Sequence, residues 1–351
     1  MRIAYQAHLN DGRGSGVVSK MAAQVDHWRR EGHTVKLFIA TADTDESWHG
    51  AMGDATISRY DGAFSRLRTM TGLVRRVRAF RPDLIYLRSD VFYPPMWWFP
   101  SGVPLVIEVN TDDLAEFALG RWIRAQYNAL TRRFLLHRAA ALIFVTSELS
   151  RLPSFNGSSA RHEVISNGID LASYPVLPAV TAGPPRLVFV GTSGQPWHGI
   201  DKIASLAKLR PDWQVDVVGV TDPGGSVQNI RWHGQLERAA LVAVLADADL
   251  GIGTLALHRK SMNEACPLKV REYLAVGLPV LYGYADPDAD ELGANVLRIA
   301  NTPTNVVDEL DRIDAFVHRC RGARVPRSSV AHIDTAYKEG QRLALFSDLA
   351  G

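Results

Sequence analysis

At 351 residues the chain is too long for one ordinary hydrophobic core, and it fits two domains of roughly 150–180 residues each. A content of 46% hydrophobic and 22% charged residues is typical of a soluble globular protein and excludes a disordered chain. The net charge of +2 is too small for the domain-wide basic face that nucleic-acid binding requires, so we expect no nucleic-acid partner.

The two cysteines, Cys266 and Cys320, are too few for a disulfide framework and stand in no metal-binding spacing. No apolar run approaches the roughly 18–20 residues that a membrane-spanning helix needs, and the first residues lack the apolar stretch of a signal peptide. We therefore expect a reduced, cytoplasmic setting in which any membrane contact is peripheral, on the inner face.

The first half of the chain alternates strand and helix patterns. A short apolar strand is predicted at residues 3–7, and the glycine loop Gly14-Ser15-Gly16 separates it from a helical pattern at residues 17–31. Further strands are predicted at residues 34–40, 84–87, 105–109 and 141–146. Because a βαβ unit of this length needs a right-handed crossover, we expect a doubly wound α/β domain with a parallel sheet.

The segment at residues 64–81 interleaves arginines with apolar residues. A basic amphipathic helix of this kind can lie on an anionic membrane surface. It can also cover the sheet with its arginines in solvent, and we favour this second interpretation. Trp97-Trp98 follows two prolines and could contact an acceptor or a lipid, or pack in the core.

The pattern breaks near Asn167-Gly168, where the glycine suits a turn, and prolines then cluster up to Pro185. Strand patterns resume at residues 186–191, 215–219, 230–232, 250–252 and 279–282. We expect an N-terminal domain over residues 1–172, a linker over 173–185 and a C-terminal domain over 186–325. The remainder, 326–351, contains an amphipathic helix that we expect to pack back on the N-terminal domain.

The most informative stretch covers residues 263–280. A helix is predicted over residues 268–275, with Pro267 suited to its first turn and Gly277 closing it. A helix start offers unpaired N–H groups and a positive dipole end, which is where a diphosphate would sit. Lys269 stands in the first turn, where the dipole disfavours a cation unless an anion is nearby. The pattern therefore indicates a phosphate site.

Two carboxylates flank this helix start. Glu272 lies three residues after Lys269 on much the same helical face, where it can accept hydrogen bonds from a ribose diol. Glu264 precedes the helix and can reach a sugar. The run from Pro267-Leu268-Lys269 to residue 280, with Glu264 and Glu272 separated by seven residues, resembles the donor motif of retaining GT-B glycosyltransferases, the glycosyltransferase group 1 domain family.

The resemblance extends over nearly the full chain, through the glycine loop, residues 164–170 and residues 188–191. It implies an α/β GT-B fold of two Rossmann-like doubly wound domains that face a cleft. It also implies that Glu264 contacts the donor sugar and Glu272 the ribose. Pro267 and Leu268 belong to the same donor-binding run, and Gly14, Ser15 and Gly16 approach the donor phosphates or the acceptor.

The mechanism that the family implies is front-face displacement with retention of configuration, in which the donor's own phosphate helps to deprotonate the acceptor hydroxyl. It needs no enzymic nucleophile. No Asp-x-Asp stands at a family-matched position, and helix dipole and side-chain cations can meet the diphosphate charge, so we expect no metal and no cofactor.

The sequence departs from the family near the second domain's first strand. Many relatives have arginine after the glycine and a Lys-Gly pair a few residues on, whereas this chain has Thr192 and His198-Gly199. Both still count as donor-binding candidates, although His198 could instead only cap its loop. The available substitute cations are Lys269, protonated His198, Arg259 and Lys260. We prefer Lys269 with His198, because both lie in segments that match the family.

A third departure concerns the first domain. Relatives often place a histidine where this chain has Asn110. The Glu108-x-Asn110 variant with an upstream Tyr86-x-Arg88 resembles a recognised branch of the family, so we interpret Asn110 as a changed catalytic contact. Asp112, Asp113 and Glu116 could favour the start of the following helix, and for Asp113 and Glu116 we prefer this interpretation to a catalytic role.

These features favour a retaining transferase that moves a hexosyl or aminohexosyl group from a nucleotide sugar, UDP rather than GDP, to a hydroxyl. The acceptor is a glycan, a lipid-linked molecule or a small molecule. The alternatives are a catalytically silent nucleotide-sugar binder and a sugar-nucleotide epimerase. A dinucleotide dehydrogenase is disfavoured, because the glycine loop lacks the third glycine of that fingerprint.

Overall fold

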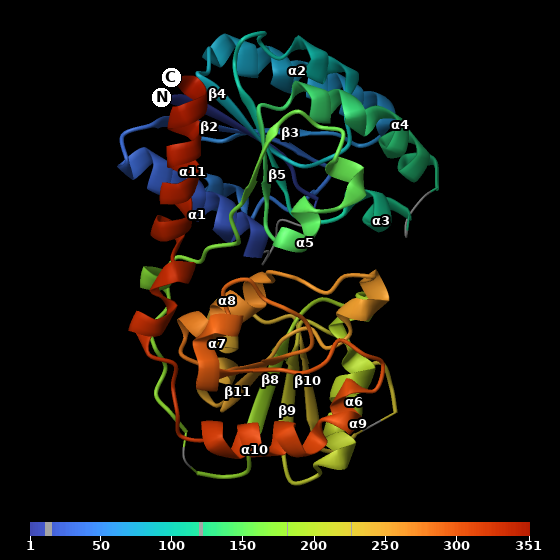
Figure 1. Cartoon of the computed structure of the whole chain (residues 1–351), viewed down its shortest axis with the longest axis vertical. Helices are drawn as coiled ribbons and strands as arrows, with labels where there is room; N and C mark the ends of the chain where they lie inside the picture. The colour runs from blue at the N-terminus through green and yellow to red at the C-terminus, as the bar shows by residue number, and fades with distance from the viewer. Residues whose placement is uncertain (11–15, 119–121, 181, 226) are drawn as a thin grey trace. The chain divides into compact units, whose positions relative to one another are not determined.

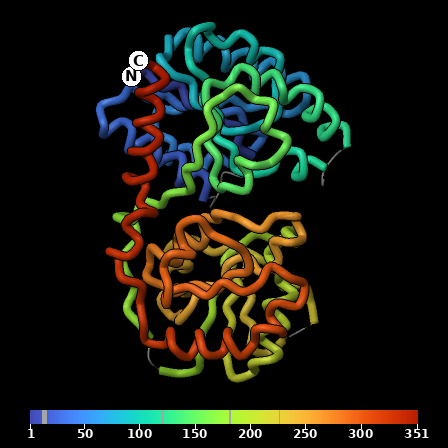
Figure 2. The backbone as a smooth tube through the Cα atoms, viewed as in Figure 1, coloured from blue at the N-terminus to red at the C-terminus, as the bar shows by residue number. Residues whose placement is uncertain are grey.

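The computed structural model describes residues 1–10, 16–118, 122–180, 182–225 and 227–351. The chain divides into two compact units, one of Met1–Ser166 with Lys338–Gly351 and one of Asn167–Tyr337. The division lies before the expected boundary at residue 172, so the stretch expected as a linker belongs to the second unit. Of the last expected segment, only Lys338 onward joins the first unit. Figure 2 traces these two crossings of the chain.

In the described part of the first unit, seven parallel strands form one sheet in the order β3-β2-β1-β4-β5-β6-β7. The strands are β1 (Arg2–His8), β2 (Thr34–Thr41), β3 (Thr56–Arg59), β4 (Leu84–Arg88), β5 (Leu105–Val109), β6 (Ala141–Phe144) and β7 (Arg161–Val164). The order reverses between β1 and β4, which is the switch point of a doubly wound fold. Ligands in such sheets bind outside the carboxyl ends of the strands at this point.

Helices cover both faces of this sheet. They are α1 (Gly16–Arg30), α2 (Ala63–Phe80), α3 (Asp113–Ala118), α4 (Trp122–Arg138), α5 (Ser147–Ser150) and α11 (Thr335–Ala350), with 3-10 turns at η1 (His49–Met52), η2 (Pro94–Trp98) and η3 (Pro153–Phe155). Helices α1 and α11 run side by side (Figure 1), and Trp28 meets Phe346 with ring centroids 5.3 Å apart. Tyr86 contacts both rings. The C-terminal helix thus completes the core of the first unit.

Six parallel strands form the second sheet, counted over the described residues of 167–337, in the order β10-β9-β8-β11-β12-β13. The strands are β8 (Arg186–Val190), β9 (Gln214–Val218), β10 (Ile230–Gly234), β11 (Leu250–Ile252), β12 (Val280–Tyr282) and β13 (Val296–Arg298). The helices are α6 (Ile200–Leu209), α7 (Arg238–Ala246), α8 (Leu268–Ala275), α9 (Asn305–Asp308) and α10 (Leu310–Cys320). Turns of 3-10 helix are η4 (Leu171–Ser173), η5 (Pro196–His198), η6 (Leu257–Lys260), η7 (Asp290–Asn295) and η8 (Arg327–Ile333).

Alternating side chains of β8 divide the second core into two layers. Val188 packs with α7 and α8 on one face, whereas Leu187 and Phe189 pack with α6 and α10 on the other. This alternation follows from the two-residue period of a strand. Strand β8 is therefore fixed by a core on each of its faces, and α8 belongs to one of the two cores.

The expected α/β architecture, with one parallel sheet in each of two domains, is confirmed. The predicted central strands are present, but the strands β3, β7 and β13 were not predicted. Each lies at an edge of its sheet, where one face and one side are open, so its sequence carries no continuous apolar run. The expected helix in the last segment begins only at Thr335, because η8 precedes it.

Helix α2 corresponds to the arginine-rich segment. It buries Met70, Leu73, Val74 and Val77, so it covers the sheet as we favoured, and its arginines at positions 68, 75, 76 and 78 are exposed. Among the described helices, none is both long and apolar enough to cross a membrane.

Candidate functional site

Helix α8 confirms the predicted helix at residues 268–275. Gly277 has φ +86°, and its N–H donates to Leu274 O while Leu278 N–H donates to Tyr273 O. This pair of bonds is the Schellman ending that favours glycine. At the other end Pro267 is the N-cap and no side chain caps the helix. The first N–H groups of α8 therefore have no side-chain acceptor within the helix cap, as a phosphate-binding helix start requires.

The loop that carries Glu264 is held by backbone pairing. Ala285 N–H donates to Asn263 O (2.8 Å), and Ala265 N–H donates to Ala285 O (3.0 Å). Asn167 fixes the next turn, since its Nδ2 donates to Cys266 O (2.6 Å) and its backbone N–H lies 3.0 Å from Cys266 Sγ. Asn167 is thus more than the turn residue that the sequence suggested, because its side chain sets the backbone between the two glutamates.

Arg271 anchors α8 from its buried side. Its fully buried guanidinium donates to Asp286 and to Asp288 (Nη2–Oδ2 2.6 Å), and its Nε lies 3.4 Å from Asn167 O. Asp286 also accepts the N–H of Asp288 at 3.1 Å. The Asp286-x-Asp288 pair is therefore used as the counter-charge of an arginine. Sequence reasoning missed this group, although an arginine between two functional helix positions was a signal for a partner.

In the described part of the chain, Lys269 lacks the hydrogen-bond partners that Arg271 has. Its Nζ lies 4.0 Å from the centre of the Phe189 ring, is shielded from solvent and has no hydrogen-bond partner among the described residues. Burial lowers the pKa of Lys269 to about 7, and Glu272 only partly opposes this shift. An ammonium group held without an anion in an apolar setting is poised to bind one.

His198 also packs against the Phe189 ring. Its ring centroid is 5.3 Å from that of Phe189, and its Nδ1 is buried with no partner within the described part of the chain. Burial, followed by the nearby Lys269 charge, lowers the pKa of His198 to about 3, although a backbone hydrogen bond at Thr192 opposes this. The expected protonated imidazole is therefore corrected: the ligand-free histidine is neutral at physiological pH.

Gly191 explains how these groups fit so closely. A Cβ at this position would lie 2.6 Å from Phe189 Cε1 and 3.0 Å from His198 Cε1. Any larger residue would push the histidine away from the end of β8. Thr192, which follows, is exposed, so its side chain is accessible to a ligand.

The two remaining candidate cations have other contacts. Arg259 forms a two-pronged ion pair with Asp201 (2.8 and 2.6 Å) and donates to Pro196 O. Lys260 lies over the Trp197 ring at 4.6 Å. Lys269 therefore stands apart from both, because it is the buried one with no acceptor in the described residues.

Glu272 is positioned by a tyrosine that sequence reasoning missed. Tyr174 OH donates to Glu272 Oε1 (3.3 Å), and the Arg238 guanidinium lies 4.9 Å over the Tyr174 ring. Burial raises the pKa of Glu272, while the Tyr174 hydrogen bond, Arg238 and Lys269 act against this rise. Tyr174 comes from the stretch expected as a linker, and a lone tyrosine there carries no recognisable signal.

In the first unit, Asn110 directly follows β5 and is held by its neighbours. Its Nδ2 lies 3.2 Å from Glu108 Oε2, and its Oδ1 lies 3.4 Å from Lys20 Nζ. Lys20 on α1 also donates to Glu108 Oε1 (2.7 Å). Gly16 begins α1, whereas Gly14 and Ser15 lie outside the described residues.

Glu108 is the centre of a buried charge group that includes Lys20, Arg88, Arg342 and Glu339. Arg342 Nη2 lies 3.4 Å and Arg88 Nη1 3.6 Å from its carboxylate, and Arg342 pairs with Glu339 at 2.7 Å. Burial alone would raise the pKa of Glu108, but Lys20, Arg342 and Arg88 outweigh it and hold the pKa well below its ordinary value. The Tyr86-x-Arg88 and Glu108-x-Asn110 motifs thus meet here, since Tyr86 is also buried beside the group.

A second polar cluster lies at the same end of the sheet. His8 Nδ1 is 2.7 Å from Asp90 Oδ2, His8 Nε2 contacts Tyr60 OH, and Tyr60 OH donates to Asn10 Oδ1 (3.1 Å). Arg124 lies 3.5 Å from Asp90. No spacing in the sequence links these residues, because they lie at or just after the ends of three different strands.

Of the acidic residues after β5, Asp112 has the role expected of a helix start. Asp112 Oδ1 accepts the N–H groups of Leu114 (3.1 Å) and Ala115 (3.3 Å). Asp113 pairs with Arg132 at 2.8 Å. Within the described residues, no three His, Cys, Asp or Glu side chains gather closely enough to hold a metal ion.

Comparison with known proteins links these features to one class. Residues 15–168 match the glycosyl transferase 4-like domain. Sucrose-phosphate synthase from Thermosynechococcus elongatus is similar in structure, with a TM-score of 0.74 at 15% identity over 99% of each chain. HepE of Anabaena, in complex with UDP and glucose, gives 0.72 at 16% identity over 99% of this chain and 100% of its own.

An α-glucosyltransferase in complex with UDP gives a TM-score of 0.63 at 11% identity, over 99% of this chain and 100% of that chain. Comparison with curated protein sequences gave no match. At these identities the structural likeness establishes the fold. Residues 15–168 are thus similar to the glycosyl transferase 4-like domain, and the structural likeness shows that the chain as a whole has the GT-B fold.

Proposed function

We propose that the chain transfers a hexosyl or aminohexosyl group from a nucleoside-diphosphate sugar to a hydroxyl acceptor, with retention of configuration. The observation that carries this proposal is Lys269, an ammonium group that is buried at an uncapped helix start with no acceptor in the described residues. The diphosphate of a donor would supply the missing anion. UDP is favoured as the nucleotide, because the similar HepE structure holds UDP and glucose.

In this proposal different elements of the second unit bind different parts of the donor. The N–H groups of α8, with Lys269, hold the diphosphate and stabilise the charge that develops as the sugar leaves. Glu272, oriented by Tyr174, accepts the ribose hydroxyls, and Glu264 contacts the sugar. Neutral His198 donates or accepts one hydrogen bond through its unpartnered Nδ1.

Elements of the first unit contact the donor and the acceptor. Asn110, oriented by Glu108 and Lys20, contacts the donor sugar, and the glycine loop Gly14-Ser15-Gly16 approaches the phosphates or the acceptor. Displacement occurs on the front face, with a donor phosphate oxygen taking the proton of the acceptor hydroxyl. The mechanism that we propose uses no metal and no enzymic nucleophile.

The acceptor is a glycan, a lipid-linked molecule or a small molecule. We propose a cytoplasmic setting, in which the basic segment 64–81 contacts the inner membrane face when the acceptor is lipid-linked. Five exposed or half-buried arginines of α2 support such a contact.

The first experiment measures nucleotide binding and then turnover. Stabilisation of the purified protein against heat is compared for UDP, GDP, ADP and their sugars, since a ligand that binds only the native state raises the apparent melting temperature. We expect UDP and UDP-sugars to give the largest shift. Release of nucleoside diphosphate is then followed over a panel of acceptors, and NMR of the product reports the anomeric configuration.

Glu272→Ala is the decisive variant, with Glu291→Ala as its matched control, because Glu291 is an exposed carboxylate of the same unit. We expect Glu272→Ala to abolish turnover and Glu291→Ala to preserve it. Intact turnover in Glu272→Ala, or inversion of the anomeric configuration, would contradict the proposal.

A second candidate function is a catalytically silent nucleotide-sugar binder. Two features favour it: His198 is neutral, and position 192 holds a threonine in place of a basic residue. Fewer fixed cations weaken stabilisation of the leaving group. Calorimetric binding of UDP without transfer, even with the acceptor that the pathway uses, would support it. Conversion of the donor without any acceptor would instead indicate an epimerase.

A further inference from the structure

Helix α4 buries polar side chains and exposes large apolar ones. It buries Asn128, Arg132 and Leu135, of which Asn128 and Arg132 bind Asp113. Its exposed side carries three large apolar residues, since Trp122 is 72%, Ile123 67% and Leu130 68% exposed. Large apolar side chains that stay exposed to this extent indicate a surface that binds another molecule.

The outward apolar positions form a stripe. Ile123, Tyr127, Leu130 and Phe134 recur at i, i+4, i+7 and i+11, which places them along one side of α4. At the end of this stripe Trp97 of η2 meets Phe134, with ring centroids 5.1 Å apart. The stripe therefore continues from α4 onto η2.

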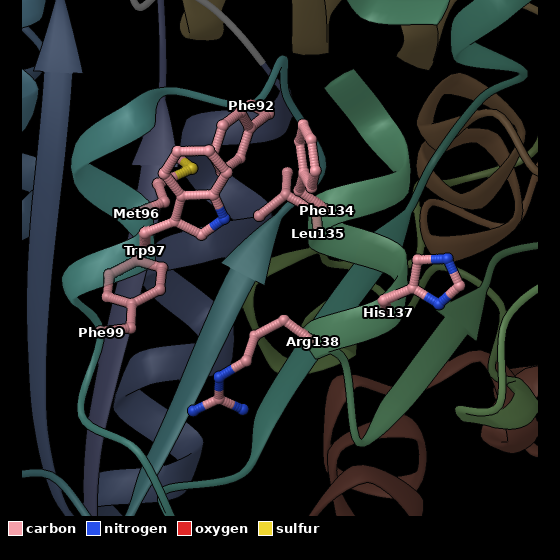
Figure 3. A pocket seen from close by; sticks show the side chains of 8 residues that line it. All are labelled: Phe92, Met96, Trp97, Phe99, Phe134, Leu135, His137 and Arg138. Atoms are coloured by element: carbon pink, nitrogen blue, oxygen red, sulfur yellow. The ribbon is translucent and has the colours of Figure 1, made fainter. Parts of the chain in front are cut away.

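The turn η2 adds two further exposed rings. Trp97 is 62% and Trp98 52% exposed, and Trp97 also meets Phe92 at 5.1 Å. Figure 3 shows the rings of Phe92, Trp97 and Phe134 grouped around a cavity of about 310 Å³, with Arg138 at its far end. Met96, Phe99 and Leu135 complete its apolar lining. This cavity is wide enough for part of a hydrocarbon chain.

Helix α2 extends the surface on the other side of η2, because the two elements pack together. Phe64 at its start is 93% exposed. Phe64, Arg68, Arg75 and Arg78 recur at i, i+4, i+11 and i+14, so one side of α2 presents an apolar tip and a row of arginines.

Charge is strongly concentrated on these two helices. Together α2 and α4 carry nine of the chain's 39 lysine and arginine residues and none of its 37 aspartate and glutamate residues. The rest of the chain therefore has a net charge of −7. A net positive charge therefore coincides with the apolar surface, whereas the rest of the chain has a net negative charge.

We propose that the surface formed by α2, η2 and α4 binds an anionic lipid bilayer, with Trp97, Trp98, Trp122, Ile123 and Leu130 in the interface and the arginines among the head groups. Tryptophan suits this depth because one part of its ring system is apolar and its N–H is polar. Arginine reaches phosphate from an apolar base. An anionic bilayer is the occupant that the charge favours, because α2 and α4 carry nine arginines and no acidic residue.

The inference adds η2 and α4 to the basic segment considered above, and it stands whether or not the donor chemistry is correct. Its test measures binding and no turnover. The purified full chain is sedimented with vesicles of phosphatidylcholine alone and of phosphatidylcholine with phosphatidylglycerol, and tryptophan emission is recorded in parallel.

We expect binding to the anionic vesicles, a shift of emission to shorter wavelength and weaker binding at high salt. The variant Trp98→Ser/Trp122→Ser/Leu130→Ser should lower vesicle affinity at least tenfold, because burial of each large apolar side chain contributes strongly. Its matched control, Leu209→Ser/Val307→Ser, alters exposed apolar residues of the second unit and should bind like the native chain.

A second variant keeps the apolar surface and removes charge. Arg68→Gln/Arg75→Gln/Arg78→Gln changes exposed residues and should lower affinity about fivefold per arginine. Equal binding by the native chain and both variants would overturn the proposal, as would no preference for anionic vesicles. Binding to duplex DNA or polyglutamate as tight as binding to the anionic vesicles, without an emission shift, would also overturn it. Self-association of the native chain that the apolar variant abolishes would overturn it as well.

Discussion

Two buried charges, Glu108 in the first unit and Lys269 in the second, have opposite surroundings. In the first unit the Glu108 carboxylate accepts a hydrogen bond from Lys20 at 2.7 Å and lies within 3.6 Å of Arg88 and Arg342. Each charge of this group therefore has a counter-charge. In the second unit Lys269 is shielded from solvent beside the Phe189 ring, and no acceptor reaches it from the described residues. Both arrangements cost desolvation, but only the first recovers part of it within the protein.

This difference separates a structural role from a binding role. A closed set of ion pairs fixes elements of the fold, and here it ties β5, α1 and α11 together. An uncompensated charge destabilises the empty protein, and a ligand of opposite charge relieves that cost. The pair of sites can be tested by removing one charge from each.

The largest effect is expected from Glu108→Gln. The substitution leaves Lys20 and Arg342 buried without their shared carboxylate, so the free energy of unfolding should fall by about 3–5 kcal/mol. Urea unfolding followed by tryptophan fluorescence measures it. Glu163→Gln, which removes a surface partner of Arg161, is the control and should cost less than ~1 kcal/mol. Similar losses in both variants would show that the Glu108 group does not hold the fold.

Lys269→Met should reverse this pattern. The unfolding free energy should stay level or rise, because an uncompensated buried charge is replaced by an apolar side chain of similar length. Nucleoside diphosphate binding should weaken by about 1.5–3 kcal/mol, or roughly 10- to 150-fold, as measured by calorimetry. Lys208→Met alters an exposed lysine of α6 and should change neither quantity. Unaltered nucleotide affinity in Lys269→Met would remove the lysine from the site.

The pH dependence of stability gives a third test of Lys269. Its pKa is about 7 in the native state and about 10.5 ordinarily, so the unfolded chain binds more protons between these values. The free energy of unfolding should therefore rise as pH increases from 7 towards 10. Lys269→Met should show a smaller rise than the native chain and than Lys208→Met, in urea unfolding at pH 7 and pH 9. Equal slopes would mean that Lys269 is charged and compensated in the empty protein.

The smallest effect is expected from Tyr174→Phe. Loss of the hydrogen bond to Glu272 should weaken UDP binding by about 0.5–1.5 kcal/mol, or roughly two- to tenfold, with little change in stability. If Glu272 holds the ribose diol, the same substitution should matter less for 2′-deoxyuridine diphosphate. A penalty that is identical for the two nucleotides would place the ribose elsewhere.

The sequence predicts the centre of each sheet better than its edges. Strands such as β5 and β11 are buried on both faces, so their apolar runs match the observed bounds. The edge strands β3, β7 and β13 are partly exposed and contain arginine or glutamate, so their patterns resemble loops. The extent of a sheet depends on contacts that a local pattern does not record.

The same limit applies to the site. Helix α8, its glycine ending and the unusual position of Lys269 follow from local rules for helix ends. Tyr174, Asn167 and the Arg271 group depend on segments that meet only after folding, 98, 99 and 15 residues apart in sequence. The protonation of His198 could not be predicted either, since it depends on burial against Phe189 and on the charge of Lys269.

Helix α11 makes the first unit a product of both chain ends. It begins at Thr335 in the second unit and ends beside Trp28, whose indole N–H donates to Glu339 (2.9 Å) and whose ring meets Phe346. A fragment cut after Ser166 would expose this aromatic face and lose the carboxylate, so it is a poor candidate for separate expression. The second unit is an insertion that could be excised as one continuous piece. A hybrid enzyme should accordingly exchange residues 167–337 and retain both flanking segments.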